Sequence, residues 1–458
     1  MDSQNLNIVI LAAGAGTRMH SQTPKVLHEL SGKPILQHVI ETALKSNPAR
    51  LIIVYGHGGE LVKSTINNIC PHVDIIWVKQ EEQLGTGHAL KEALPNITAN
   101  GKTLILYGDA PLISPHTLDV MAKQHNNNII ILTAILQDPY GYGRIIRDTH
   151  QHISMIVEEK DATSIQKEIR EVNSGVYIFP NQMLPEWLNS ISNNNAQNEY
   201  YLTDVIKIAH TEGVEIQSVT AHHEYEIFGI NNKTQLESLE RICNHINVGV
   251  LLEKGVTIKD KSRVEIRGDV TMGQDCVIDV NCVFEGRVII GNNVIINAGC
   301  ILKNVTIKDN VNIKPYSVIE GAVIEDNCQI GPFARIRPET VLQADAHIGN
   351  FVEVKKSMVG ANSKINHLTY IGDSQIGAHV NVGAGSVTCN YDGTNKHQTI
   401  IEDDAFIGSG TMMVAPVTIG TGAIIGAGSV ITKNAPADEL TLTRARQTTI
   451  IGWKKKQR

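Results

Sequence analysis

The chain has 458 residues, 42% of them hydrophobic and 19% charged, which is the composition of a water-soluble protein with two or three domains. It carries 40 lysines and arginines against 47 aspartates and glutamates, a net charge of -7, so a nucleic-acid binder of the usual basic kind is not expected. No apolar run approaches the length of a membrane span, and seven cysteines without a C-x-x-C motif favour free thiols. We therefore expect a cytoplasmic protein that binds neither nucleic acid nor membrane.

The first half of the chain alternates segments typical of strands and of helices. The segment at 34–44 predicts a helix, because its apolar residues fall on one face. Apolar runs predict strands at 7–11, 51–55, 74–78, 103–107, 129–136 and 176–179. The alternation predicts a mostly parallel α/β sheet in a domain at 1–233, with ligands bound at the carboxyl ends of its strands.

A glycine-rich turn follows the first predicted strand. It reads Leu11-Ala12-Ala13-Gly14-Ala15-Gly16-Thr17-Arg18-Met19, with Pro24-Lys25 after it. Backbone N–H groups in such a turn can approach phosphates, and Arg18 and Lys25 add two cations that suit a triphosphate. The turn lacks the third glycine of a dinucleotide fingerprint and the Gly-Lys-Ser/Thr of a P-loop, and a Gly-x-Gly by itself is also compatible with a structural turn.

Residues 234–254 predict a helix that links two domains. Thr234 to Glu237 fits a capping box at its start, and an apolar stripe runs from Leu236 to Val250. Gly255 stands where the helix is expected to end.

Aliphatic residues recur every six positions in the domain expected at 255–458. The runs are Ile289, Ile295, Ile301, Ile307, Ile313 and Ile319; Ile324, Ile330, Ile336, Leu342, Ile348 and Val354; and Ile401, Ile407, Met413, Ile419, Ile425 and Ile431. This period predicts a parallel β-helix whose recurring side chains point to its axis. Glycine often follows the recurring residue, and we expect it to supply positive φ at the corners. The repeat breaks at 388–399, in a polar loop where function is expected.

Several separate motifs resemble one known family. They are the glycine-rich turn, Gln83-Leu84-Gly85-Thr86-Gly87-His88-Ala89, Tyr107-Gly108-Asp109, Gly141-Tyr142-Gly143-Arg144, Val157-Glu158, Asn173-Ser174-Gly175 and Gly229-Ile230-Asn231-Asn232. Together with the hexad repeat, the chain resembles, essentially end to end, the bifunctional bacterial N-acetylglucosamine-1-phosphate uridylyltransferases / glucosamine-1-phosphate N-acetyltransferases. The resemblance implies a Rossmann-like nucleotidyltransferase domain, a left-handed parallel β-helix, and synthesis of UDP-N-acetylglucosamine for the cell wall and lipopolysaccharide.

The resemblance implies a uridylyltransferase site in the first domain. UTP and the sugar nucleotide would contact Leu11, Ala12, Ala13, Gly14, Lys25, Gln80, Gly85, Thr86, Tyr107, Gly108, Asp109, Gly143, Glu158, Asn173 and Asn231. Asp109 and Asn231 would bind Mg²⁺, which prefers one or two such oxygens beside phosphates and waters, although Asp109 alone is also a common turn former. The attacking sugar phosphate is already an anion, so Arg18, Lys25 and Mg²⁺ need only position it and neutralise charge, without a covalent enzyme intermediate.

The resemblance implies a second site, for acetyl transfer from acetyl-CoA. His367 would be the general base for the glucosamine amine, because imidazole suits proton removal near neutral pH. Glucosamine 1-phosphate would contact Arg337, Lys355, Tyr370 and Asn381. Acetyl-CoA would contact Ala384, Asn390, Tyr391, Ser409, Ala427 and Arg444, with Asn390 and Tyr391 also orienting the sugar phosphate. Members of this class associate as homotrimers with the acetyl-transfer sites between subunits.

Three positions depart from the family pattern. Ala15 replaces a lysine, Asn366 replaces a small residue before His367, and Ala445-Arg446 replaces a Val-Pro, which bears on the CoA assignment of Arg444. Two other interpretations stay open. A single-activity pyrophosphorylase with an oligomerising solenoid would release no thiol from acetyl-CoA, and a non-enzymatic binding protein would release no pyrophosphate.

Overall fold

The computed structural model describes residues 6–14, 16–56, 58–124 and 128–454. The chain divides into two compact units between Cys243 and Asn244, inside helix α8 (Lys233–Glu253). The helix predicted at 234–254 is therefore present. Its place as a linker between domains at 1–233 and 255–458 stays a prediction, because the division falls within the helix.

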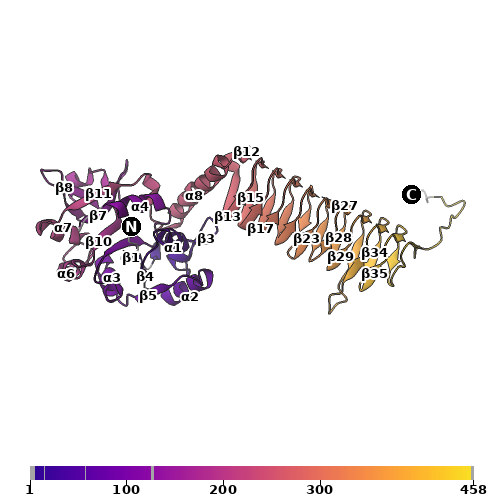
Figure 1. Cartoon of the computed structure of the whole chain (residues 1–458), viewed down its shortest axis with the longest axis horizontal. Coiled ribbons are helices and arrows are strands. Elements are labelled where there is room, and N and C mark those ends of the chain that lie inside the picture. The colour runs from indigo at the N-terminus through magenta and orange to yellow at the C-terminus, as the bar shows by residue number, and fades with distance from the viewer. Residues whose placement is uncertain (1–5, 15, 57, 125–127, 455–458) are drawn as a thin grey trace. The chain divides into compact units, whose positions relative to one another are not determined.

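The first unit is built on one mixed sheet (Figure 1). Its strands run in the order β11 (Ile216–Thr220), β7 (Ile129–Ile135), β10 (Glu171–Pro180), β6 (Lys102–Tyr107), β1 (Leu6–Ala12), β4 (Arg50–Tyr55) and β5 (Ile75–Lys79). Only β10 is antiparallel to its neighbours along this path, and β8 (Arg144–Arg147) and β9 (Ile153–Val157) form a hairpin beside it. All six predicted strands are confirmed, and the mostly parallel sheet with them.

Helices cover both faces of this sheet, because alternate residues of each strand are buried on opposite sides. Ile8 and Ile10 pack with α1 (Ile35–Lys45), α2 (Gly59–Ile69) and α4 (Pro115–Lys123). Val9 and Leu11 pack with α3 (Thr86–Ala93), α6 (Leu184–Ser190) and α7 (Asp204–Thr211). The short helix α5 (Ser164–Lys167) lies before β10 in the chain. The predicted helix at 34–44 is confirmed as α1, and the doubly covered sheet leaves its strand ends free to form a site.

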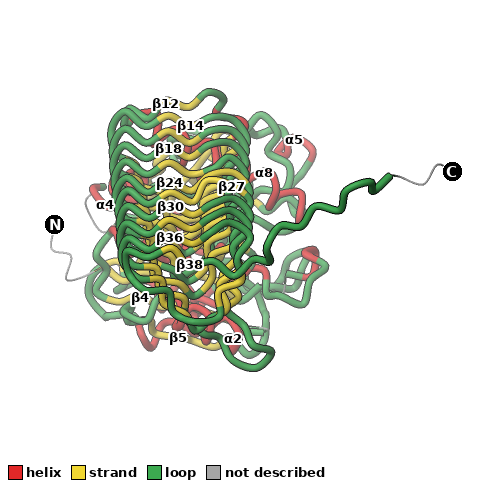
Figure 2. Tube along the Cα trace, turned by 90° about the vertical axis from the view of Figure 1, so that its right-hand side faces the viewer, coloured by secondary structure: helices red, strands yellow, loops and turns green. Residues whose placement is uncertain are grey.

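The second unit is a parallel β-solenoid whose coils stack on one another (Figure 2). One face consists of β12 (Thr257–Ile258), β14 (Val277–Ile278), β16 (Ile295–Ile296), β18 (Asn312–Ile313), β21 (Gln329–Ile330), β24 (His347–Asn350), β27 (Lys364–His367), β30 (Asn381–Val382), β33 (Phe406–Ile407), β36 (Ile424–Ile425) and β38 (Leu440–Thr441). A second consists of β19 (Val318–Glu320), β22 (Arg335–Ile336), β25 (Glu353–Lys355), β28 (Tyr370–Gly372), β31 (Val387–Cys389), β34 (Met412–Val414) and β37 (Val430–Ile431). A third consists of β20 (Ala322–Ile324), β23 (Thr340–Leu342), β26 (Met358–Val359), β29 (Ser374–Ile376), β32 (Thr399–Ile401) and β35 (Val417–Ile419), and β13 (Val264–Met272), β15 (Cys282–Ile290) and β17 (Ile301–Ile307) precede both. The predicted hexapeptide β-helix is confirmed.

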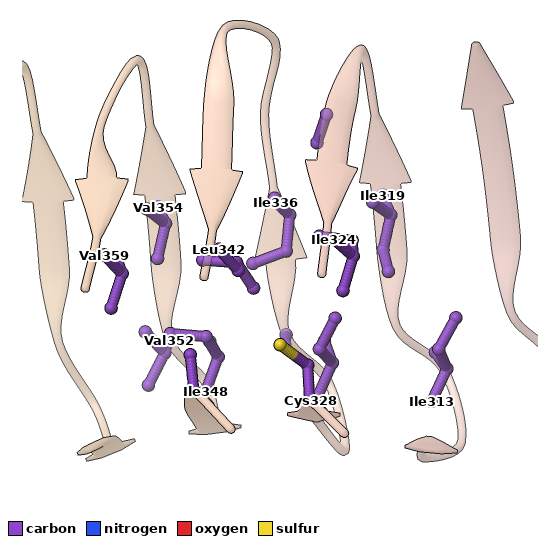
Figure 3. Packing of buried hydrophobic residues seen from close by; sticks show 14 of the residues in the cluster. Ile313, Ile319, Ile324, Cys328, Ile336, Leu342, Ile348, Val352, Val354 and Val359 are labelled. Atoms are coloured by element: carbon purple, nitrogen blue, oxygen red, sulfur yellow. The ribbon is translucent and has the colours of Figure 1, made fainter. Parts of the chain in front are cut away.

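The inward side chains of the solenoid agree with two of the three predicted runs. The runs that begin at Ile324 and at Ile401 are buried throughout, and Figure 3 shows Ile324, Ile336, Leu342, Ile348 and Val354 directed into one core. The first run is wrong over its first half, since Ile295 and Ile301 are 42% and 39% exposed and Ile289 is half-buried.

A shortened coil causes this error. Phe284 pairs with Leu302 eighteen residues on, whereas Leu302 pairs with Ile319 only seventeen residues on. The buried residues upstream of Ile307 are accordingly Leu302, Ile296 and Ile290, each one position later than the strict six-residue count predicts.

Most of the glycines that follow the core positions serve close packing rather than positive φ, contrary to our expectation. At Gly349 an added Cβ would lie 2.0 Å from the backbone oxygen of Asn366 in the next coil. The positive-φ corners are instead often Asn or Asp, which tolerate that conformation better than other side chains.

One corner departs from this rule, because bulky apolar residues occupy it. Tyr316, Phe333, Phe351 and Leu368 have φ between 49° and 57° and are all exposed. The three rings stack with centroids 5.3 Å apart from one coil to the next. We call these four residues the aromatic ladder. The next three coils place Gly385, Gly410 and Gly428 at this corner.

All seven cysteines are free thiols, and Cys276, Cys282, Cys300 and Cys328 lie in the solenoid core. None of the helices in the described ranges is both long enough and apolar enough to cross a membrane.

Candidate active sites

The carboxyl ends of β1 and β6 open onto a cavity of about 320 Å³. Its lining includes the predicted residues Leu11, Ala12, Ala13, Gly14, Lys25, Gln80, Gly85, Thr86, Tyr107 and Asp109. Four further lining residues, Val26, Gln83, Ala89 and Glu199, were not predicted. A wider cavity of about 890 Å³ shares Gly14, Gln80 and Gln83 with it. Separate sequence motifs therefore meet at the strand ends, where an α/β sheet binds ligands.

Two glycines shape this cavity in ways that other residues cannot. Gly16 has φ of 63°, and an added Cβ would lie 2.7 Å from the Cβ of Lys25. Gly85 has φ of 105°, and its Cβ would lie 2.7 Å from the backbone oxygen of Tyr200. Glycine is thus required at both positions for conformation and for space.

Two glutamine side chains tie the cavity's loops together. Gln83 Nε2 donates to the backbone oxygen of Ala13 at 2.7 Å. Gln80 Nε2 donates to the backbone oxygen of Gly85 at 3.1 Å and lies 3.0 Å from His88 Nδ1. Gln83 is the first residue of the motif at 83–89, but the sequence alone does not show that its side chain holds the glycine-rich turn.

Lys25, Asp109 and Asn231 meet at one point of this site. Lys25 Nζ donates to Asp109 Oδ2 and, at 3.1 Å, to Asn231 Oδ1. Asp109 follows β6 and Asn231 precedes α8, and the Ile230 backbone N–H donates to the Asp109 backbone oxygen at 2.9 Å. The carboxylate oxygen of Asp109 and the amide oxygen of Asn231 both face the Lys25 ammonium, and Mg²⁺ binds oxygens of these two kinds. The residues present therefore fit a magnesium ion.

The residues assigned to the sugar lie together beside Tyr107. The Asn173 backbone N–H donates to the Gly143 backbone oxygen at 2.9 Å, and a Cβ on Gly143 would lie 3.5 Å from both carboxylate oxygens of Glu158. Thr203 Oγ1 donates to Glu158 Oε1 at 3.2 Å. Burial raises the pKa of Glu158, and burial together with the Glu158 charge raises that of Tyr107. The cluster is a desolvated pocket whose carboxylate has room for further donors.

Six predicted positions fall outside the cavity lining: Gly143, Glu158, Asn173 and Asn231, described above, and Gly108 and Arg18. Gly108 lies beneath it, since its backbone N–H donates to the Leu11 backbone oxygen at 2.9 Å. Arg18 lies in the 3-10 turn Thr17–Met19 with an exposed side chain, which the structure does not bring to the cavity. Ala15 lies outside the described residues.

In the second unit, His367 belongs to a row of residues at the ladder corner of successive coils. The row consists of Asn350, His367, Ala384, Ser409 and Ala427, each of which precedes a positive-φ residue. Backbone N–H groups of Gly385, Gly410 and Gly428 donate to the oxygens of His367, Ala384 and Ser409 at 3.3, 2.8 and 2.8 Å. Arg444 Nη1 donates to the Ala427 backbone oxygen at 2.9 Å. We call this set the corner row; it aligns His367 with residues predicted to contact acetyl-CoA.

A charged cluster lies on the adjoining face. Lys355 Nζ is 3.7 Å from Asp373 Oδ2, which also accepts a hydrogen bond from Asn390 Nδ2. Lys396, which the sequence did not indicate, lies so near Lys355 that this neighbour lowers its pKa. Two ammonium groups near a single carboxylate leave excess positive charge, which suits a phosphate.

Arg337 and Tyr370, also predicted to contact glucosamine 1-phosphate, lie on the same face as this cluster. Arg337 Nη1 donates to Glu353 Oε1 at 2.8 Å, and this carboxylate raises the pKa of the guanidinium. A Cβ on Gly372 would lie 2.5 Å from Tyr370 Oη and 2.8 Å from Asn390 Nδ2, so these two side chains converge. Asn381 lies on the other face that meets the corner row, on β30.

The polar loop predicted at 388–399 closes on itself. Tyr391 Oη donates to the Gly393 backbone oxygen at 2.5 Å, and Tyr391 remains exposed. Asp392 accepts from the backbone N–H groups of Asn395 and Thr394 and pairs with His397 at 2.7 Å. These partners lower the pKa of Asp392 to about 2, so this carboxylate stays ionised at ordinary pH.

Comparisons with known proteins match three separate segments of the chain to known domains. A MobA-like NTP transferase domain matches residues 8–171, a GMPPB C-terminal domain matches 266–367, and six bacterial transferase hexapeptide repeats match 398–433. The chain is 53% identical to the bifunctional protein GlmU of Chromobacterium violaceum, over 100% of this chain and 99% of that protein. The chain belongs to the GlmU family of bifunctional proteins. GlmU proteins of Janthinobacterium sp. (strain Marseille) and Nitrosomonas eutropha are 51% and 50% identical, over 98% of this chain and 99% and 98% of theirs.

Membership of the GlmU family confirms the resemblance seen in the sequence. The chain is a bifunctional enzyme of UDP-N-acetylglucosamine synthesis, with uridylyltransferase and acetyltransferase activities. One solved structure, the inositol-1-phosphate CTP transferase from T. maritima, covers 52% of this chain and 97% of its own at a TM-score of 0.41 and 16% identity, which is too weak to carry an argument.

Proposed function

We propose that the two activities of this GlmU protein are divided between its two units. The first unit transfers UMP from UTP to N-acetylglucosamine 1-phosphate, and the second acetylates glucosamine 1-phosphate. The observation that carries the first assignment is the convergence of Lys25, Asp109 and Asn231 beside the cavity. The corner row around His367 carries the second.

In uridylyl transfer, an oxygen of the sugar phosphate attacks the α-phosphorus of UTP and pyrophosphate leaves. The nucleophile is an anion already, so the protein contributes position and charge. Gln80 and Gly85 hold the nucleotide, Glu158 and Asn173 hold the sugar, and Lys25 neutralises phosphates at the cavity. Arg18, which is exposed on the glycine-rich turn, would reach the phosphates only once UTP is bound. Asp109 and Asn231 would hold a Mg²⁺ ion, which supplies charge neutralisation between the two phosphates when bound.

In acetyl transfer, the amine nitrogen attacks the thioester carbon of acetyl-CoA, the carbon–sulfur bond breaks and CoA leaves as its thiol. His367 takes the proton that the nitrogen loses and passes it to the departing sulfur. Arg337, Lys355 and Lys396 hold the acceptor phosphate, with Tyr370, Asn381 and Asn390 beside it. Acetyl-CoA lies along Ala384, Ser409 and Ala427 of the corner row, with Tyr391 and Arg444 at its sides.

We assign the aromatic ladder to contact with further copies of this chain, in a homotrimer. Exposed rings at strained corners are costly in a monomer and favourable once covered. The ladder runs directly into the corner row, because Phe351 follows Asn350 and Leu368 follows His367. A second copy on the ladder would therefore border the acetyl-transfer site. We place the enzyme in the cytoplasm, where its seven free thiols are stable.

Two single variants test the division of labour. Arg18→Ala should lower uridylyl transfer by at least about a hundredfold, as loss of a transition-state charge contact does, and leave acetyl transfer intact. His367→Ala should lower acetyl transfer by about a hundredfold or more, as loss of a general base does, and leave uridylyl transfer intact. Undiminished uridylyl transfer in Arg18→Ala, or undiminished acetyl transfer in His367→Ala, would remove that residue from the mechanism.

A further inference from the structure

Within the described residues, the side-chain partner of the His367 ring is an amide. His367 Nδ1 lies 2.7 Å from Asn350 Oδ1, a residue of the preceding coil that the sequence did not indicate. An amide oxygen only accepts hydrogen bonds, so Nδ1 carries the proton in this arrangement. The neutral ring then has its free lone pair on Nε2, which is what a general base needs.

We propose that Asn350 is a positioning residue for acetyl transfer, which fixes His367 in the tautomer whose Nε2 accepts the amine proton. The proposal rests on the proposed role of His367 as the base. It goes beyond that role because it names the group that orients the base and predicts how the reaction depends on pH.

The backbone around this pair is held in place from several directions. Asn350 and His367 pair in register between β24 and β27. The Leu368 backbone N–H donates to the Asn350 backbone oxygen at 3.1 Å, and Thr369 Oγ1 donates to the His367 backbone oxygen at 2.7 Å. Gly349 lets β27 approach closely, since any Cβ there would meet Asn366. The backbone therefore holds the two side chains next to each other.

The reverse orientation of the amide would defeat the proposed chemistry. If Asn350 Nδ2 donated to Nδ1, the ring proton would lie on Nε2, which could no longer accept a proton while the ring is neutral. The orientation with Oδ1 toward the ring is the one compatible with a base at Nε2.

A neutral partner also orients the base without favouring its charged form. A carboxylate in this position would stabilise the imidazolium, whereas an amide orients the ring without adding charge. The histidine ion pairs of the described chain involve His88, His152 and His397 rather than His367. On the strands that pair here, the titratable side chains are His347 of β24 and Lys364 of β27, neither of which is acidic.

The test uses the full-length enzyme and the pH dependence of acetyl-CoA-dependent thiol release. In Asn350→Ala, kcat for acetyl transfer should fall about ten- to a hundredfold, part of what a general base contributes, with KM for glucosamine 1-phosphate little changed. In Asn350→Asp the hydrogen-bond acceptor remains, so kcat at high pH should be largely kept. The added carboxylate should move the acidic limb of the pH–rate profile up by about one pH unit or more.

Asn312→Ala is the matched control. Asn312 lies on the same face of the solenoid, two coils earlier, and accepts a hydrogen bond from Asn297 of the coil before at 3.1 Å. Loss of that coil-to-coil bond should leave the acetyl-transfer profile as in the parent. Circular dichroism and thermal melts, measured on every variant, report that the solenoid is folded, and uridylyl transfer reports that the first unit is intact.

The outcomes distinguish the positioning role of Asn350 from the general-base role of His367, on which it rests. If His367→Ala retains acetyl transfer, the general-base role itself is wrong. If His367→Ala is inactive but Asn350→Ala keeps full kcat, or if Asn350→Asp leaves the pH profile unmoved, the base acts without Asn350 and the positioning role is overturned.

Discussion

Glu158 shows how a single residue trades stability for binding. It accepts one hydrogen bond, from Thr203, in a pocket that removes it from water, and this desolvation raises its pKa. A carboxyl whose pKa is raised by folding destabilises the protein increasingly as pH rises through that folded value. The ionised form keeps spare acceptor capacity, which sugar hydroxyl groups can satisfy when N-acetylglucosamine 1-phosphate binds.

Glu158→Gln should therefore be more stable than the parent yet bind the sugar less well. At pH 7.5 its melting temperature should exceed that of the parent, and the difference should shrink as pH falls to the range where Glu158 becomes protonated. KM for N-acetylglucosamine 1-phosphate should rise about tenfold, the cost of weakening a charge-assisted hydrogen bond. Thermal melts at several pH values and uridylyl transfer kinetics measure the two effects. The role given to Glu158 is contradicted if the melting temperature of the variant, compared with that of the parent, is lower at pH 7.5 than at low pH.

At the scale of elements, the solenoid is held together by the inward side chains of its short strands. Ile336 is fully buried, whereas Ile295, which the strict six-residue count would also direct inward, is 42% exposed. Coil length decides between them, and the shorter coil between Leu302 and Ile319 shifts the register.

Ile336→Ala and Ile295→Ala should thus differ sharply. Ile336→Ala removes packed atoms and leaves a cavity, at a cost of about 2–5 kcal/mol in unfolding free energy. Ile295→Ala lies at the surface and should cost less than about 0.5 kcal/mol. Urea titrations that follow loss of acetyl transfer measure both; equal costs would mean that the register is misassigned.

What the sequence could predict depended on how local each signal is. The six strands that were predicted in the first unit are largely continuous apolar runs, because both faces of the sheet are buried there, whereas β11 mixes polar with apolar residues and was missed. The hairpin β8–β9 was not predicted either, because β8 has only four residues, two of them arginines, and Ser154 interrupts the apolar residues of β9. Lys25 and Asp109 could be proposed from motifs, but Lys396 and Asn350 acquire a role only when coils stack them against Lys355 and His367.

At the scale of the whole molecule, each unit has hydrophobic clusters of its own, so each can carry one activity. The second unit alone displays the aromatic ladder beside its site. With the proposed trimer contact at the ladder, we expect acetyl transfer, rather than uridylyl transfer, to depend on association.

Phe333→Glu should separate association from folding. A charge in the middle of the ladder should break the trimer and lower acetyl transfer at least about tenfold, since an unpaired charge inside an interface costs several kcal/mol. Ile165→Glu, at a residue 80% exposed in the first unit, is the control and should change neither property. Sedimentation and both assays measure the result, and a Phe333→Glu trimer with full acetyl transfer would show that the ladder is not the interface.

The most direct test of the account is a coupled assay on the purified protein. Glucosamine 1-phosphate, acetyl-CoA, UTP and Mg²⁺ are supplied together, and thiol and pyrophosphate are followed separately. Two sites acting in sequence predict both signals, with pyrophosphate release dependent on acetyl-CoA, abolished thiol release in His367→Ala, and pyrophosphate restored in that variant by added N-acetylglucosamine 1-phosphate. Pyrophosphate from N-acetylglucosamine 1-phosphate without any thiol release by the parent would contradict the account and reduce the solenoid to a scaffold.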